Sequence, residues 1–295
     1  MNQTWNPQAG PDPNTKTPRF TLPAGACDCH VHIYGPADRF PFLPSRVERA
    51  FEAPKNRLEI MHKKIGVDRC VIVHGFTHGF DLSVTLDAIE TGSGRYRAVA
   101  LVDDAISDQR LEELHAAGIR GVRYSIILGG KSLKTDAIQR MAERIATFGW
   151  HLVLHLKGDD IVTYADFLKR LPVPLVFDHM AGIDPASGGV NQEPFQFLVS
   201  HLKDGNGWAK ISGIEKASNQ SYPFDDAAAL AKALILAAPD QVIWGSDWPH
   251  PQMGRQGPTN DGDLVDLIPF YASDTATQRK LLVDNPARLY GFRGP

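Results

Sequence analysis

Two groups of polar residues that could perform chemistry lie far apart in the sequence, and each follows an apolar run. The first contains His30 and His32, and the second contains Ser246, Asp247 and His250. Residues i and i+2 of a strand point to the same side, so His30 and His32 can aim two imidazoles at one point. Such a pair suits metal binding or paired proton transfer. The alternative is two unrelated loop histidines, which the late carboxylate cluster disfavours.

Other polar residues follow the remaining apolar runs. They are His74, Thr77 and His78, then Asp103 and Asp104, Arg123 and Ser125, His155 and Lys157, Asp178 and His179, and Lys210 and Ser212. Core packing alone would favour apolar residues at these points. We therefore expect His30, His32, His155, His179 and Asp247 to converge in one place, here called the polar site.

The residue types at the polar site allow two kinds of chemistry. Imidazoles and a carboxylate suit zinc, and a catalytic zinc keeps one position open for water, whose pKa it lowers to about 7. Without metal, Asp247 would act as the general base on water while the histidines polarise a substrate carbonyl. The sequence leaves both versions open. Arg123 could bind a substrate carboxylate through two parallel hydrogen bonds, or form an ion pair inside the protein.

Eight apolar runs alternate with helical patterns along the chain. The runs are Ala26–Ile33, Arg69–His74, Tyr96–Val102, Gly121–Ile127, His151–Leu156, Pro174–His179, Trp208–Ser212 and Gln241–Trp244. Eight strand–helix units predict an α/β fold, a (β/α)8 barrel of the TIM type with its chemistry at the carboxyl ends of the strands. The alternative is an open doubly wound sheet, which normally carries a glycine-rich turn where this chain has His30 and His32. His115 and His201 fall within helical patterns, and we expect both to be solvated.

Length and composition agree with one large domain. The chain has 295 residues, of which 43% are hydrophobic and 22% charged, so a large core is expected and disorder is not. Residues 1–20 are rich in Pro, Asn, Gln and Thr and are predicted to form an N-terminal arm. Residues 21–295 are assigned to a single barrel domain.

The same totals restrict partners and location. The net charge of -3 gives no reason to expect nucleic acid or a membrane as a partner. No apolar run is long enough to span a bilayer, and the N-terminus lacks the features of a signal peptide. Three cysteines, Cys27, Cys29 and Cys70, are too few for a disulfide framework and fit a reducing cytoplasm, where they would fill the core. Nothing in the sequence indicates an oligomeric state.

Three motifs, in this order, resemble the amidohydrolase superfamily. They are Asp28-Cys29-His30-Val31-His32, Phe177-Asp178-His179-Met180 and Trp244-Gly245-Ser246-Asp247-Trp248-Pro249-His250-Pro251. The chain is most similar to the branch of 2-pyrone-4,6-dicarboxylate hydrolase and related lactonases. The resemblance implies a distorted barrel that hydrolyses a lactone ester, with His30, His32, His179 and Asp247 as the catalytic centre. It also implies substrate contacts by His78 and Arg123.

The chain departs from that branch at several positions. The pyrone enzyme carries tyrosine where this chain has His155, whereas most metal-using amidohydrolases carry histidine there, so His155 favours a metal. Arginines that grip carboxylates in the pyrone enzyme correspond to Gly129, Gly182 and Lys216. This chain therefore lacks much of the positive charge that would bind a ligand with two carboxylates. We therefore expect a different lactone, from the breakdown of a sugar acid or an aromatic compound.

The predicted function is a hydrolase that opens a lactone ester in a carboxylated small molecule, with Asp247 activating water. His78, Arg123, His155 and Lys216 are assigned to substrate binding. Zinc or manganese is expected at the polar site, and metal-independent catalysis stays open. The alternatives are a metal-dependent decarboxylase or a lactone isomerase of the same superfamily, and a non-catalytic barrel that binds small carboxylates.

Overall fold

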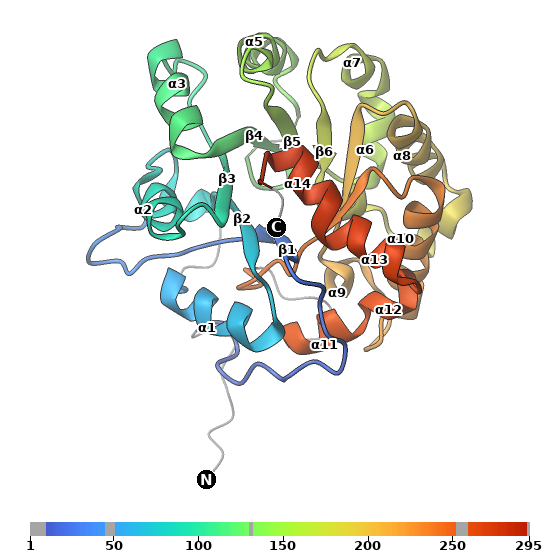
Figure 1. Cartoon of the computed structure of the whole chain (residues 1–295). Coiled ribbons are helices and arrows are strands. Elements are labelled where there is room, and N and C mark those ends of the chain that lie inside the picture. The colour runs from blue at the N-terminus through green and yellow to red at the C-terminus, as the bar shows by residue number, and fades with distance from the viewer. Residues whose placement is uncertain (1–9, 45–50, 130–131, 252–258, 294–295) are drawn as a thin grey trace.

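Eight parallel strands form one sheet in the order of the chain, from β1 to β8. The computed structural model describes residues 10–44, 51–129, 132–251 and 259–293. The strands are β1 (Cys27–Val31), β2 (Arg69–Val73), β3 (Tyr96–Ala100), β4 (Ile119–Ser125), β5 (His151–His155), β6 (Leu175–Phe177), β7 (Gly207–Ile211) and β8 (Val242–Trp244). Each overlaps one predicted strand segment. Helices lie between the strands and surround them (Figure 1), so the predicted (β/α)8 barrel is confirmed.

The ring closes between β1 and the segment that follows β8. Val31 forms a parallel bridge with Trp248. The backbone N–H of Asp247 donates to the carbonyl of His30 at 2.8 Å, and the N–H of His32 donates to the carbonyl of Trp248 at 2.7 Å. Closure therefore places the first and last polar motifs of the sequence side by side.

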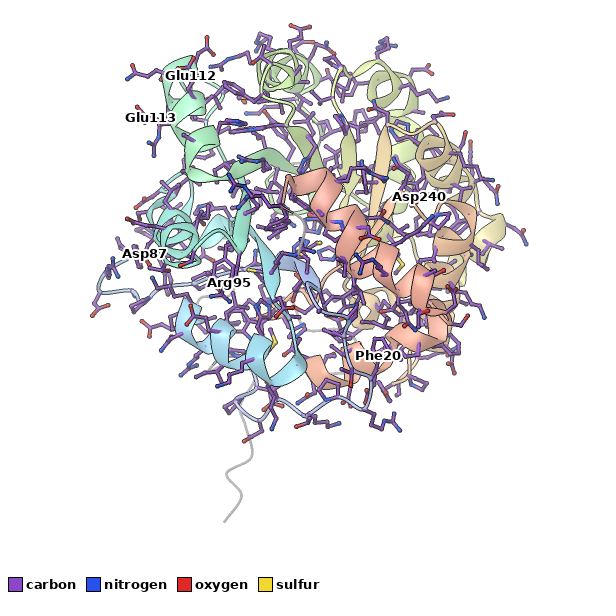
Figure 2. The ribbon with its side chains drawn as sticks, viewed as in Figure 1. Phe20, Asp87, Arg95, Glu112, Glu113 and Asp240 are labelled. Atoms are coloured by element: carbon purple, nitrogen blue, oxygen red, sulfur yellow. The ribbon has the colours of Figure 1, made fainter. Side chains whose placement is uncertain are left out.

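The outer helices each bury one face against the strands. Between strands lie α1 (Lys55–Ile65), α2 (Ser83–Thr91), α3 (Asp108–Ala117), α4 (Ile126–Gly129), α5 (Thr135–Ala146), α6 (Gly158–Thr163), α7 (Ala165–Arg170), α8 (Glu193–Lys203), α9 (Ile214–Ala217) and α10 (Asp225–Ala237). In α3, Leu111 and Leu114 are buried, whereas Glu112 and Glu113 are exposed and point away from the barrel (Figure 2). No helix in the described ranges is long and apolar enough to cross a membrane.

An apolar cluster fills much of the ring interior beneath the polar motifs. All strands except β4 contribute to one buried cluster, which contains Cys27, Cys29, Val71, Val99, Val153, Val176, Trp208 and Ile243. Residues from such distant strands can meet only inside the ring. Tyr290 and Phe292 join this cluster, and α14 (Asn285–Tyr290) lies across the ring (Figure 1). The three cysteines are free and buried, as predicted.

The described part of the N-terminal arm packs against the first helix after β8. After β8 come α11 (Asp261–Asp266), α12 (Ile268–Tyr271), α13 (Thr275–Arg279) and α14. Lys16 pairs with Asp263 at 2.5 Å, and Arg19 pairs with Asp266 at 3.2 Å. A Cβ added at Gly262 would lie 2.4 Å from the carbonyl oxygen of Lys16. The arm therefore packs directly on the backbone of α11.

The fold makes a testable prediction about pH through His151. This side chain is buried inside the ring against Tyr290, with ring centroids 5.1 Å apart. Burial lowers the pKa of His151 to about 3. In the unfolded chain His151 binds a proton near pH 6.5, whereas in the folded chain it does not. Protonation of His151 therefore favours unfolding as pH falls below that value. Integrated from pH 7.5 to pH 5, the loss is about 2 kcal/mol of unfolding free energy.

The substitution His151→Leu removes this titration and keeps a side chain of similar volume. Between pH 7.5 and pH 5 we expect the wild type to lose about 2 kcal/mol more unfolding free energy than the variant. Urea denaturation at both pH values measures this shift. A difference that stays constant with pH would show that His151 is not held neutral in the folded state.

Candidate active site

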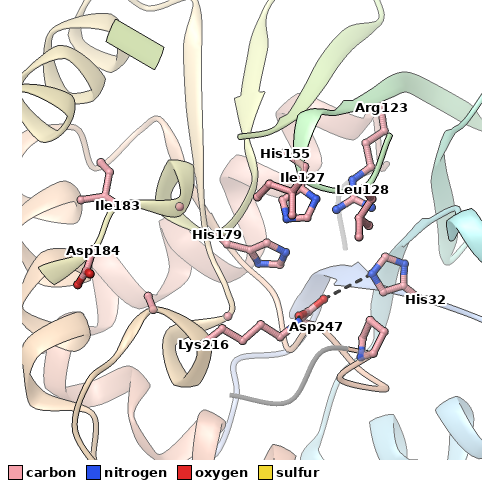
Figure 3. Close-up of a pocket in the computed structure, with 14 residues that line it drawn as sticks. His32, Arg123, Ile127, Leu128, His155, His179, Ile183, Asp184, Lys216 and Asp247 are labelled. Atoms are coloured by element: carbon pink, nitrogen blue, oxygen red, sulfur yellow. Dashed lines mark hydrogen bonds and ion pairs between the residues drawn. The ribbon is translucent and has the colours of Figure 1, made fainter. Parts of the chain in front are cut away.

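A cavity of about 190 Å³ opens at the carboxyl ends of the strands. Its lining consists of His32, Arg123, Ile127, Leu128, His155, His179, Gly182, Ile183, Asp184, Gly213, Lys216, Ala217, Asp247 and Pro251. In Figure 3, the side chains of His155, His179 and Lys216 converge on the space in front of Asp247. This is the end of a (β/α)8 barrel at which function is normally located.

Three atoms of the types that ligate metals meet at one edge of this cavity. Nε2 of His30 lies 3.3 Å from Nε2 of His32, and each lies 3.5 Å from Oδ1 of Asp247. Nδ1 of His32 donates to the carbonyl of Val73 at 2.6 Å, which leaves a lone pair on its Nε2. Oδ1 of Asp247 is buried without a hydrogen-bond partner among the described residues. Ligands of a tetrahedral ion lie about 3.4 Å apart when the bonds are about 2.1 Å, so these three atoms fit a divalent cation.

A buried cluster of ions orients His30. Its Nδ1 lies 3.3 Å from Oδ1 of Asp178, and Nζ of Lys210 lies 3.1 Å from the same oxygen. Arg123 donates from Nε to Oδ2 of Asp178 at 2.9 Å. Nζ of Lys210 also lies 3.4 Å from this Nδ1. Nδ1 therefore either accepts from Lys210 or donates to the carboxylate of Asp178, and we assign the second arrangement because a carboxylate can only accept. The Nε2 lone pair of His30 then faces His32 and Asp247.

Serine hydroxyls hold the other two histidines of the polar site. Nδ1 of His179 lies 2.9 Å from Oγ of Ser212, and Nδ1 of His155 lies 3.0 Å from Oγ of Ser125. His179 begins a run of three non-glycine residues with φ between 52° and 59°. L-residues rarely adopt this region, and such strain is typical of functional sites. The strained turn brings the rings of His179 and His30 to a centroid distance of 4.6 Å.

The two carboxylate oxygens of Asp247 have different surroundings. Nζ of Lys216 pairs with Oδ2, while Oδ1 faces the two imidazoles. Lys216 belongs to the single turn of α9, which follows Gly213. A Cβ at Gly213 would lie 2.9 Å from Nδ1 of His179, so only glycine lets this turn approach so closely.

The protonation states follow from burial and charge. Burial alone would raise the pKa of Asp247, but Lys216 holds it well below its usual range. The cations around Asp178 likewise outweigh burial and hold its pKa well below the usual range. Burial lowers the pKa of His30 and His179. At neutral pH the carboxylates are therefore ionised and these imidazoles are neutral, as metal ligands or a general base require.

The structure brings most of the predicted polar site together. Within the described residues, ligand atoms lie within 4.8 Å of one another in two groups, His30–His32–Asp247 and His30–Asp178–His179. His155 belongs to neither group, although it lines the cavity and its ring centroid lies 5.5 Å from that of His179.

The residues assigned to substrate binding lie in different places. Arg123, His155 and Lys216 line the cavity, whereas His78 is not among the lining residues. Nδ1 of His78 lies 3.2 Å from the carbonyl oxygen of Pro41, and the N–H of Gly35 donates to its Nε2 at 3.3 Å. Both ring nitrogens of His78 thus contact the loop after β1. A role of His78 in binding stays a prediction.

Sequence reasoning missed the supporting residues. It placed Asp178 and Lys210 at strand ends but gave them no role, and hydrogen bonding to His30 is a three-dimensional relation that no local motif encodes. It was also wrong about His201, which is buried with 4% of its surface exposed. His115 is partly buried and accepts a hydrogen bond from Nε1 of Trp150 at 2.9 Å.

Known proteins match this chain along almost its whole length. The family model described as Amidohydrolase matches residues 27–292. The chain belongs to the amidohydrolase family. The 2-pyrone-4,6-dicarboxylate hydrolase of Comamonas testosteroni is 38% identical over 290 residues, which cover 94% of this chain and 93% of that relative. The 4-sulfomuconolactone hydrolase of Rhizobium radiobacter is 34% identical over 290 residues, with 97% and 96% covered.

Two further relatives extend this comparison. The D-galactarolactone isomerase of Agrobacterium fabrum is 27% identical over 277 residues, with 92% of this chain and 93% of the isomerase covered. A solved apo structure from Agrobacterium tumefaciens is 26% identical, has a TM-score of 0.82 and covers 94% of this chain and all of its own. This amidohydrolase thus lies in a branch that contains both lactone hydrolases and a lactone isomerase.

The ion cluster beneath His30 makes a prediction about stability. Lys210 and Asp178 are both fully buried, so Lys210→Met leaves a buried carboxylate with one counter-ion fewer. We expect a loss of about 3 kcal/mol in unfolding free energy. The control Lys280→Met breaks a surface pair with Asp240 and should cost less than about 1 kcal/mol. Equal losses in the two variants, measured by urea denaturation, would contradict the buried pairing.

Proposed function

We propose that this amidohydrolase opens a lactone ester in a carboxylated small molecule. The observation that carries the proposal is the carboxylate of Asp247, whose Oδ1 faces two imidazoles and has no hydrogen-bond partner among the described residues. An ionised carboxylate in this position can take a proton from a water molecule that attacks a carbonyl. The relatives named as lactone hydrolases support the same reaction class.

In this proposal each residue of the site has a separate role. Asp247 holds the attacking water and accepts its proton, while Lys216 keeps the carboxylate ionised and oriented through Oδ2. Nδ1 of His179 is hydrogen-bonded to the hydroxyl of Ser212, and we propose that the hydroxyl donates, so that the Nε2 proton of His179 is available to the carbonyl oxygen in the cavity. The water oxygen bonds to the carbonyl carbon, the ring C–O bond breaks, and the leaving ring oxygen receives the proton that Asp247 took from the water, which yields a hydroxy acid.

We also propose that His30, His32 and Asp247 hold a divalent metal ion, with zinc or manganese as the ions that this donor set suits. The support is the triangle formed by the Nε2 atoms of His30 and His32 and Oδ1 of Asp247, whose separations of 3.3 and 3.5 Å fit a divalent ion. A bound ion would polarise the carbonyl and lower the pKa of the attacking water. His155, hydrogen-bonded to Ser125, is assigned to the substrate and not to this ion.

The cavity wall favours a substrate with one carboxylate. Among the described lining residues, Arg123 and Lys216 supply the cationic side chains, and each already pairs with an aspartate. A Cβ at Gly182 would lie 2.4 Å from the carbonyl oxygen of Leu156, so an arginine has no room there. Much of the remaining wall is apolar, formed by Ile127, Leu128, Ile183, Ala217 and Pro251. We infer a lactone with one acidic group and an apolar part.

A lactone isomerase is the second candidate, because a relative at 27% identity carries that name. Isomerisation needs the same base, but a hydroxyl of the substrate attacks in place of water. Product analysis separates the two reactions, since only hydrolysis consumes water and releases an acid.

The role of Asp247 is tested with a panel of muconolactones, pyrones and aldarolactones, followed by chromatography of the products. We expect the wild type to open at least one lactone and Asp247→Asn to lose on the order of 10³-fold in kcat/KM, as expected for a missing general base. Asp263→Asn, which changes a surface aspartate paired with Lys16, is the control and should keep full activity. Turnover retained in Asp247→Asn would exclude Asp247 as the base. Release of carbon dioxide with the ring intact would indicate decarboxylation, and binding without product a non-catalytic barrel.

The metal is tested by elemental analysis of purified protein, with activity measured before and after chelation. We expect about one zinc or manganese per chain, loss of activity on removal and recovery on re-addition, because we assign a single ion to His30, His32 and Asp247. Full activity in metal-free protein would contradict the metal proposal and leave lactone hydrolysis intact.

A further inference from the structure

Three buried ionisable residues lie behind the loop that carries Asp247, and the proposed reaction does not use them. Nε2 of His250 lies 3.1 Å from Oδ1 of Asp261, and Nδ1 of His250 lies 3.4 Å from Oε1 of Glu215. Their side chains are 11%, 3% and 2% exposed, in the order His250, Asp261, Glu215. We call these three residues the His250 clasp. Burial alone would lower the pKa of His250, but Asp261 and Glu215 raise it to about 10.

The geometry of the clasp is that of a bridge and not of a metal site. The two carboxylates contact opposite nitrogens of the ring, so their oxygens do not converge on one point. Accordingly, the clasp is absent from the groups of converging ligand atoms among the described residues. The imidazolium hydrogen-bonds to Asp261 through Nε2 and forms an ion pair with Glu215 at Nδ1, and thereby ties the two segments together.

Each member of the clasp comes from a different segment. Glu215 is the second residue of α9, His250 follows β8, and Asp261 begins α11. The backbone of α11 is in turn fixed by the N-terminal arm through Asn260, whose Oδ1 accepts from the N–H of Lys16 at 2.9 Å. The clasp therefore anchors the short α9 turn to a part of the barrel that is held independently.

The clasp joins the same two loops that meet in the cavity. Lys216 follows Glu215 directly and pairs with Asp247, and the N–H of His250 donates to the carbonyl of Asp247 at 2.8 Å. Asp247 and His250 both have positive φ, 64° and 58°. Backbone in this region is unfavourable for L-residues and needs contacts that hold it. The ion pairs of the clasp are such contacts.

We propose that His250 is a positioning residue, which acts through Glu215 to keep Lys216 and Asp247 aligned across the cavity. This inference rests on the proposed function, because it assigns a consequence for turnover. The clasp does not touch the cavity itself, since none of its three residues is among the lining residues. Its loss changes the alignment of Lys216 and Asp247 without removing any side chain that lines the cavity.

The test is a double-mutant cycle between His250→Gln and Lys216→Met with a lactone that the wild type opens. In the wild-type background we expect His250→Gln to lower kcat on the order of tenfold to a hundredfold with little change in KM, as for a misplaced catalytic group. In the Lys216→Met background the same substitution should have little further effect, because the residue through which it acts is gone. The control His201→Gln removes a buried histidine of α8 far from this loop and should leave kcat unchanged.

Two outcomes would overturn the inference: wild-type kcat in His250→Gln, or an equal loss in both backgrounds. If His250→Gln does not fold, Asp261→Asn replaces it, since this change keeps an acceptor of the same size beside Nε2 and removes one charge. A crystal structure of the variant gives a second readout, in which the inference predicts a broken Lys216–Asp247 pair. If the wild type opens no lactone, the proposed function fails, and this structural readout still decides whether the clasp holds the pair.

Discussion

The hydrogen bonds that close the ring between β1 and the segment after β8 are the constraint on which the site depends. Asp247 donates from its backbone to His30, and His32 donates to Trp248, so residues more than two hundred positions apart share one ladder. This ladder places the side chains of His30, His32 and Asp247 next to one another. An open sheet with the same sequence would separate them by its full width.

Closure brings the acceptors together, and buried charges decide what they can do. Nδ1 of His30 lies 3.3 Å from Asp178, while Lys210 and Arg123 keep Asp178 ionised in an interior that would otherwise protonate it. On the cavity side, Lys216 does the same for Asp247. The site therefore combines ionised carboxylates with neutral imidazoles, an arrangement that is costly to build without buried cations. This cost explains why lysine side chains lie inside a barrel.

The barrel and the main acceptors could be predicted from the sequence because they depend on local periodicity and on where strands end. The alternation of apolar runs with helical patterns located all eight strands, and the spacing of His30 and His32 indicated that these two side chains share a face. The relations that join separate strands could not be predicted in this way. Lys210 and Asp178 were visible as strand-end residues, but their contact with His30 depends on side-chain direction inside the ring. The roles of Gly182 and Glu215 depend on the geometry of their loops. The burial of His201 depends on how its helix packs, and residue type alone does not reveal this packing.

The central claim is that His30 and His32 both carry their protons on Nδ1 and present Nε2 lone pairs to Asp247. The ¹⁵N NMR spectrum of protein labelled at histidine, assigned with His30→Gln and His32→Gln, reads this tautomer directly. The account predicts that Nδ1 is protonated and Nε2 unprotonated in both residues at neutral pH. A proton on Nε2 of either histidine would contradict it, because the three facing acceptors would then be an ordinary hydrogen-bonded pair beside a carboxylate.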